Sequence, residues 1–368
     1  MPLALREFAG AVTQSRAANR RTRQAVALWL FAVAAMVLVM IVLGGITRLT
    51  GSGLSIMEWA PFRGVLPPTS DAEWQRLFGL YRQIPQYVLV NQGFGLAGFK
   101  QIFWLEWVHR LWGRLIGFAF LGPLVWFWAT GRIEPRLRAW LALLFLLGAL
   151  QGLVGWIMVA SGFLPDATAV SPSRLAIHLA LALMLYAALV WTAMTVLGGT
   201  PARFRGRGLL RGMALACLAS LALTIVSGSF VAGTHAGFDY NTFPLMDGHL
   251  VPDGYGRLQP PLRNLTENIP AIQFNHRALA TFTILVSAAT IAVGLGSPLS
   301  ISVRLAVIVL GVTLAVQYVL GVATLLSVVP VGLASVHQAN AVLALTALLV
   351  LLHLLRPASD APPRMPGA

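Results

Sequence analysis

At 368 residues the chain is long enough for about two or three soluble domains, but 57% of its residues are hydrophobic, only 10% are charged and its mean hydropathy is +0.76. This composition excludes an ordinary globular protein and indicates one that is solvated by lipid. The formal charge of +14 comes from short basic clusters between apolar runs, so it indicates membrane topology and not a nucleic-acid partner.

The N-terminal residues 1–25 are polar and arginine-rich, and the apolar run after them is too long for a signal-peptide core. They are predicted to be a cytoplasmic tail that stays attached. The single cysteine, Cys217, lies inside an apolar run, so no internal disulfide, zinc cluster or thiolate pair is available. Any redox chemistry must therefore come from a bound cofactor.

Eight stretches are long and apolar enough to cross a bilayer, which takes roughly 20 residues of helix. They lie at about 26–45, 107–128, 137–158, 174–196, 208–232, 275–295, 302–326 and 333–355. The predicted fold is an all-α integral membrane protein with eight transmembrane helices. Its predicted domains are an N-terminal four-helix bundle at 26–200, a C-terminal four-helix bundle at 201–356 and a cytoplasmic C-terminal tail at 357–368.

An even number of spans places both termini on one side, and the positive-inside rule identifies that side as cytoplasmic. Arginines gather before the first span, between spans 2 and 3, between spans 4 and 5, and at the remaining ends on the same side. The two long connections, about 46–106 and 233–274, are then periplasmic. The predicted location is the inner (cytoplasmic) membrane of a bacterium, as a multi-pass protein.

The second half of the sequence repeats the first at a nearly constant offset. The matched pairs are His109 with His276, Gln151 with Gln317, Gly155 with Gly321 and His178 with His337. Because each unit has four spans, both copies enter the membrane in the same direction. The prediction is a parallel repeat of two four-helix bundles.

Four of the seven histidines occupy these paired positions, toward the outer face of the membrane. Within each copy, two imidazoles on alternate helices at similar depth suit the two axial ligands of one haem iron. A single histidine at a span end is more often an interfacial residue or a helix–helix hydrogen-bond partner, but four at duplicated positions favour ligation. Arg110 and Arg277 follow two of them and are candidate partners for haem propionates.

The other histidines carry weaker signals. His353 has no counterpart in the first half and is interpreted as structural. His235 and His249 lie in the second long connection, where a solvated or loop-packing role is favoured over ligation.

Glu106 marks an asymmetry between the halves. It precedes His109 by three residues, so the two side chains share a helix face, whereas the equivalent residue before His276 is Gln273. If both halves hold haem, the first is the reactive one and the second serves electron transfer. The alternative is that Glu106 only orients its histidine or sits in interfacial water. Glu58, expected to be solvated, is the second candidate acid.

These residues lie in motifs that resemble those of the haem A synthases. GGITRLTGSGLS, FWLEWVHRLWGR, GTHAGFDYNTFPLMDG, FNHRA and VHQANA follow one another in the order of that family, over nearly the whole chain. The chain lacks the paired loop cysteines of the Gram-positive branch, and so is more similar to the mitochondrial and alphaproteobacterial branch.

The resemblance implies an oxidoreductase that converts haem O to haem A for cytochrome c oxidase, by oxidising the C8 methyl group to a formyl group through a hydroxymethyl stage. It implies that His276 and His337 ligate the iron of a resident haem b. It also implies that His109 and His178 hold the iron of the substrate haem O, with Glu106 as the catalytic residue beside the methyl group.

The implied partners are haem O, a haem O synthase, an unidentified electron donor and membrane lipid; assembly into a homo-oligomer is left open. A dihaem electron-transfer protein of the cytochrome b type is the alternative function, and it would keep both haems permanently. A third is a transporter with duplicated halves, in which buried histidines relay protons. It would hold no haem.

Overall fold

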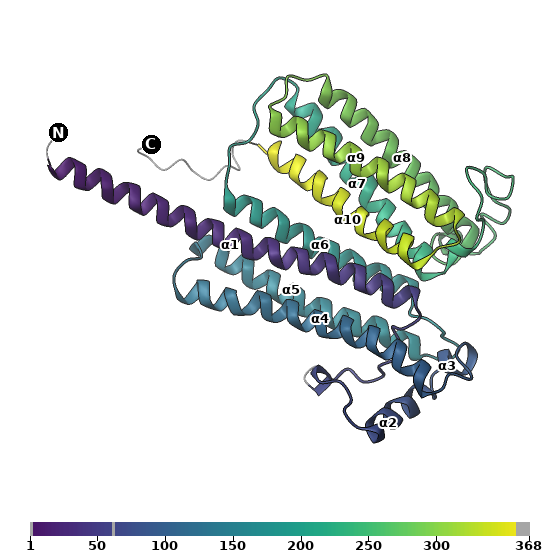
Figure 1. Ribbon diagram of the computed structural model, residues 1–368. Coiled ribbons are helices and arrows are strands. Elements are labelled where there is room, and N and C mark those ends of the chain that lie inside the picture. The colour runs from purple at the N-terminus through teal and green to yellow at the C-terminus, as the bar shows by residue number, and fades with distance from the viewer. Residues whose placement is uncertain (1–2, 61–62, 358–368) are drawn as a thin grey trace.

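The computed structural model describes residues 3–60 and 63–357, with side chains from Asn19 onward, so residues 358–368 of the predicted C-terminal tail lie outside it (Figure 1). Its eight long helices are α1 (Leu3–Leu49), α4 (Leu96–Ala129), α5 (Pro135–Ala160), α6 (Pro172–Leu197), α7 (Arg207–Gly233), α8 (Ile269–Leu295), α9 (Ile301–Leu326) and α10 (Val331–Leu354). All eight are long and apolar enough to span a membrane, with the candidate span of α1 beginning at Asn19. The described residues form no named strand, so the predicted all-α membrane fold is confirmed.

The helices pack as two groups of four. The helix α1 packs against α4 and α6, and α5 packs against both of these; in the second group α7 packs against α8, α8 against α9 and α9 against α10. Contacts of α6 with α7, and of α10 with α1 and α6, join the groups, which lie side by side in Figure 1. Most of the apolar surface buried by this packing forms one continuous core that includes Leu30, Leu141, Leu210 and Leu348.

The two long loops lie at the same end of the bundle, opposite the N-terminus (Figure 1). The first long loop (residues 50–95) contains the short helices α2 (Asp71–Tyr81) and α3 (Pro85–Leu89), and the second long loop (residues 234–268) contains the 3-10 turns η3 (Ala236–Phe238) and η4 (Pro261–Leu265). The sequence predicts both segments only as connections, so these short helices and turns are a finding of the structure. We refer to this end of the bundle as the loop end.

Helix α4 begins at Leu96, eleven residues before the predicted span at 107. The added turns carry Lys100 and are too polar for a hydropathy run, but they bury Phe99 and Phe103 against Trp74 of α2. Packing against the first long loop therefore extends this helix beyond its apolar stretch.

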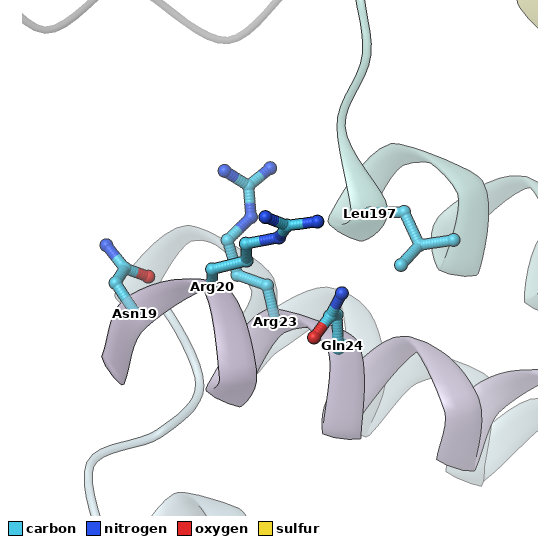
Figure 2. A pocket seen from close by; sticks show the side chains of 5 residues that line it. All are labelled: Asn19, Arg20, Arg23, Gln24 and Leu197. Carbon is cyan, nitrogen blue, oxygen red and sulfur yellow. The ribbon is translucent and has the colours of Figure 1, made fainter. Parts of the chain in front are cut away.

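The opposite end of the bundle carries arginines close to the helix ends. Figure 2 shows Arg20 and Arg23 of α1 lining an open pocket beside Leu197, the last residue of α6. The Nε of Arg23 donates to the Val196 carbonyl at 2.8 Å. This bond ties the start of the first span to the end of the fourth.

Candidate functional site

The first histidine pair lies at the loop end of the N-terminal group. His109 of α4 and His178 of α6 are partly buried and close enough that charge on one imidazole acts on the other. His109 lies against Gly44 of α1, where a Cβ atom would be 3.3 Å from Nε2, and His178 lies against Gly155 of α5, where a Cβ would be 2.9 Å from Cε1. The structure thus brings together the two imidazoles that the sequence paired.

The second pair has the same surroundings in the C-terminal group. His276 of α8 lies against Gly228 of α7, where a Cβ would be 2.9 Å from Cε1; His337 of α10 lies against Gly321 of α9, where the distance would be 3.0 Å. His337 likewise acts electrostatically on His276. Each imidazole occupies space that a side chain on the facing helix would fill, so glycine is needed there for close approach.

Two glutamines bond the histidines of α6 and α10. Nε2 of Gln151 lies 3.1 Å from Nδ1 of His178, and Nε2 of Gln317 lies 3.1 Å from Nδ1 of His337. Because an amide nitrogen donates, Nδ1 accepts in both pairs, and the proton of the neutral imidazole is then on Nε2. Iron ligation through Nε2 requires the amide to turn away or present its oxygen.

The histidines of α4 and α8 differ in this respect. Nδ1 of His276 lies 2.9 Å from the Ser227 hydroxyl, which itself donates to the Thr224 carbonyl at 2.9 Å. The hydroxyl has one proton, so it accepts from Nδ1–H and leaves Nε2 of His276 free to bind a metal. No hydrogen bond to the His109 ring is found within the part of the chain that the structure describes.

Glu106 anchors the first long loop. It is 2% exposed, and its Oε2 accepts from the Ser55 hydroxyl at 2.7 Å and the Ile56 N–H at 2.8 Å. Its Oε1 accepts from Nε of Arg110 at 3.0 Å, and the same guanidinium donates to the Glu58 carbonyl at 2.7 Å. The acid is held by donors on both oxygens, three residues from His109.

Gln273 holds the second long loop in the same position. Its Nε2 donates to the carbonyls of Ala236 and Asp239, and its Oε1 accepts from Arg277 at 2.7 Å. Arg277 also donates to the Thr242 carbonyl at 2.8 Å. The first long loop presents hydrogen-bond donors to the Glu106 carboxylate, whereas the second long loop presents acceptors to the Gln273 amide. The need to anchor each loop therefore explains part of the difference between an acid at position 106 and an amide at position 273.

Both arginines predicted to meet propionates are engaged with their loops. The Arg110 donors go to Glu106 and to loop carbonyls, and the terminal nitrogens of Arg277 go to Gln273 and loop carbonyls. Nε of Arg277 is buried, with no hydrogen-bond partner in the described part of the chain. The propionate role stays a prediction.

The remaining candidates lie apart from the paired imidazoles. Glu58 is half exposed and forms an ion pair with Arg76 of α2 at 2.9 Å. The His249 side chain is exposed, and its backbone bonds to Met246 across a tight turn. His353 is buried and lies 3.0 Å from Nη1 of Arg356, a packing role that agrees with the structural interpretation.

Two kinds of residue at this site were missed from the sequence. Gly44 and Gly228 were overlooked, although the Gly-Gly pair just before the first long loop is a visible signal of close helix approach. Ser55 and Ser227 were overlooked because a lone serine carries no pattern. Among the residues described, no cluster of three or more His, Cys, Asp or Glu could hold a bare metal ion, whereas histidine is a residue type that ligates haem iron.

Comparison with known proteins identifies the family. The profile described as "Cytochrome oxidase assembly protein", COX15-CtaA, matches residues 27–349, which contain every residue of both histidine pairs and their glycines. The chain belongs to the COX15-CtaA family.

Relatives of this COX15-CtaA chain align over most of its length. Heme A synthase of Granulibacter bethesdensis is 58% identical over 338 residues, which are 92% of this chain and 89% of the relative. Heme A synthase 2 of Acidiphilium cryptum is 46% identical over 346 residues (92% and 93%), and Heme A synthase of Rhodospirillum centenum is 50% identical over 335 residues (91% and 89%). The family resemblance predicted from the motifs is confirmed.

Proposed function

We propose that this protein is a haem A synthase, which oxidises the C8 methyl group of haem O to a formyl group through a hydroxymethyl stage and so supplies haem A to cytochrome c oxidase. The observation that carries the proposal is the pair of two-histidine sites, each lined by facing glycines. Its relatives named Heme A synthase support it over nearly the whole chain.

The C-terminal site is the proposed place of a resident haem b. His276 and His337 would hold its iron, and the haem would supply one-electron chemistry when bound. The bond from His276 to Ser227 supports this assignment, because a protonated Nδ1 held by an acceptor orients the ring and keeps Nε2 available. Each oxygen insertion into the methyl group would consume an external oxidant that supplies the oxygen, together with electrons from an external donor, since the chain has no nicotinamide or flavin motif.

The N-terminal site is the proposed place of haem O, held by His109 and His178. A substrate must enter and leave, and a ligand whose ring is less tightly fixed is easier to displace. The absence of a described hydrogen bond to the His109 ring agrees with this difference between an exchangeable and a resident haem.

Glu106 is the proposed catalytic residue. The four hydrogen bonds described for it occupy both oxygens, so it would act as a carboxylate held in place that stabilises cationic character at the methyl carbon. Arg110 holds the carboxylate in place from the next turn of α4.

The two halves are proposed to be copies of one four-helix unit in parallel orientation. Two features found in both halves support the duplication. One is the contact of each imidazole with a glycine of the facing helix, and the other is the bond from an arginine to Glu106 in the first half and to Gln273 in the second. We place the arginine-rich end in the cytoplasm of a bacterial inner membrane and the loop end in the periplasm. A haem O synthase is the proposed upstream partner.

The test is a pigment inventory. The protein is expressed in a host that makes haem O, purified in detergent and extracted with acidified solvent, and the haems are separated by chromatography with mass detection. Haem b together with haem O, its hydroxymethyl derivative or haem A is expected. Two haem b per chain would instead indicate the cytochrome b-type alternative, and no haem would indicate the transporter.

A further inference from the structure

Arg48, in the last turn of α1, differs from the other arginines near the histidine sites. Its Nη1 is buried without a hydrogen-bond partner, and no carboxylate pairs with it among the residues that the structure describes. Arg110 and Arg277, by contrast, each bond to loop carbonyls and to the side chain at position 106 or 273, although Nε of Arg277 is also buried without a described partner. A guanidinium removed from water without a counter-charge is costly, so its position indicates a missing anion.

The helix face that carries Arg48 lies between the two groups of helices. Arg48 follows Gly44 and Gly45 by four and three residues, so all three share one face of α1. A Cβ atom at Gly45 would collide with the side chain of Gln338, and Nε2 of Gln338 donates to the Ile41 carbonyl at 2.6 Å. Since Gln338 directly follows His337, α1 meets α10 at the depth of the second histidine pair.

Arg48 also reaches toward the second long loop. Its positive charge acts on His235, two residues beyond the end of α7. The residue after His235, Ala236, accepts the hydrogen bond from Gln273 that holds this loop over the C-terminal group. Arg48 therefore lies about one helical turn closer to the loop end than His337 does. It lies beside the second long loop, which covers the C-terminal group.

We propose that Arg48 binds a carboxylate of the haem held by His276 and His337. This inference rests on the proposed function only in requiring a haem at that site. Carboxylate is the anion that a haem presents at its edge, and a guanidinium matches it with two parallel donors. The N-terminal half would thereby supply a cation to the haem of the C-terminal half, and so link the two sites mechanically and electrostatically.

The experiment compares two haems in the same protein. Apoprotein prepared from a haem-deficient host is reconstituted with haem b or with haem b dimethyl ester, which lacks both carboxylates. Wild type, Arg48→Gln and Arg48→Lys are compared, with Arg23→Gln at the other end of α1 as the matched control. The readouts are the rate of haem transfer to apomyoglobin and the midpoint potential of the low-spin haem, and neither depends on turnover of haem O.

With haem b, Arg48→Gln should lose haem about tenfold faster than wild type, because one charge-assisted hydrogen bond is lost. Its midpoint potential should fall below that of wild type, because a nearby cation stabilises the reduced haem. Arg48→Lys should recover part of both, and Arg23→Gln should match wild type. With the dimethyl ester, wild type and Arg48→Gln should become equal.

Four results would overturn the inference. The first is equal behaviour of wild type with haem b and with its ester, and the second is an effect of Arg48→Gln that persists with the ester. The third is a change confined to the haem at His109 and His178. The fourth is dependence of the wild-type rate on chloride or phosphate, which would indicate that Arg48 binds a free anion. The comparison of the two haems in wild type needs no variant to fold. An Arg48 effect without haem A formation would leave this inference standing and remove the proposed activity.

Discussion

The Ser227 hydroxyl accepts a hydrogen bond from Nδ1 of His276, because the proton of that hydroxyl is already donated to the Thr224 carbonyl. Gly228 faces His276, and Gly44 of α1 faces His109. The residue before Gly44 is Leu43, which therefore takes the place of Ser227 and has no hydrogen-bond acceptor in its side chain. Ser227 therefore distinguishes the surroundings of the His276 ring from those of the His109 ring.

Ser227→Ala should weaken haem retention in the C-terminal site. Loss of an outer partner of a ligating histidine typically costs 10- to 100-fold in affinity, so haem transfer to apomyoglobin should accelerate by roughly that factor. Ser227→Thr should restore retention, because the hydroxyl is kept. Ser229→Ala is the matched control, since Ser229 is buried on the same helix and its hydroxyl bonds, among the described residues, only to the Val226 carbonyl. Equal rates for the two alanine variants would contradict this role.

Gly155→Ala should displace His178. The added methyl carbon would lie 2.9 Å from Cε1 of the imidazole, and overpacking of this kind costs about 1–3 kcal/mol. We expect haem O binding to fall while the haem b spectrum is unchanged. Gly152→Ala, on the same helix with nothing within 4 Å of the added carbon, is the control and should bind both haems. Normal haem O content in the Gly155 variant would show that the imidazole position is not critical.

Glu106→Gln should leave haem bound but stop conversion before the aldehyde. The amide has one acceptor oxygen and cannot serve Arg110, Ser55 and the Ile56 N–H together, and breaking a buried ion pair costs about 3–5 kcal/mol. Ser55→Ala tests the anchoring of the first long loop apart from the charge of Glu106. It removes one hydrogen bond to the carboxylate, worth about 1 kcal/mol, and keeps the acid itself. Haem A output should survive in Ser55→Ala and fail in Glu106→Gln. Haem A from the Glu106 variant would exclude a catalytic role for the acid.

The second long loop should loosen in mild acid. Desolvation, and then the charge of Arg48, lower the pKa of His235 below its ordinary value of about 6.5. The folded loop therefore favours the neutral imidazole; its stability is complete above about pH 6.5 and falls as the pH drops below that value. Amide hydrogen exchange of residues 234–268 should rise at pH 5.5 after correction for intrinsic rates, and His235→Gln should abolish the change. Exchange independent of pH in wild type would refute this prediction.

The transmembrane layout could be predicted because lipid solvation demands long apolar helices. The span predicted at 137–158 is Pro135–Ala160, bounded by a proline at its start. By contrast, the early start of α4 at Leu96 depends on packing of Phe99 and Phe103 against α2, which hydropathy does not report. Helix α2 itself was predictable in principle, since Ser70 accepts from the Glu73 N–H in a capping pattern visible in the sequence.

The grouping of the histidines in two pairs could be predicted because the proposed sequence repeat singles out four of the seven histidines. The packing of the histidines against glycines could not be predicted. Gly155 and His178, for example, lie on different helices, and only the helix packing brings them together. Arg110 and Arg277 were assigned to propionates by residue type, but the acceptors that they meet depend on the path of the loop backbone. Arg48 carried no signal in the sequence beyond an arginine at the end of a span.

The most direct test of the account is whether the two histidine pairs hold different haems. His109→Ala and His276→Ala, each purified from a host that makes haem O, are compared with wild type by pigment extraction and mass detection. We expect His109→Ala to keep haem b and lose haem O and haem A, and His276→Ala to lose haem b. If each variant instead loses half of a single kind of haem, the two sites are equivalent and the division into substrate and cofactor sites is wrong.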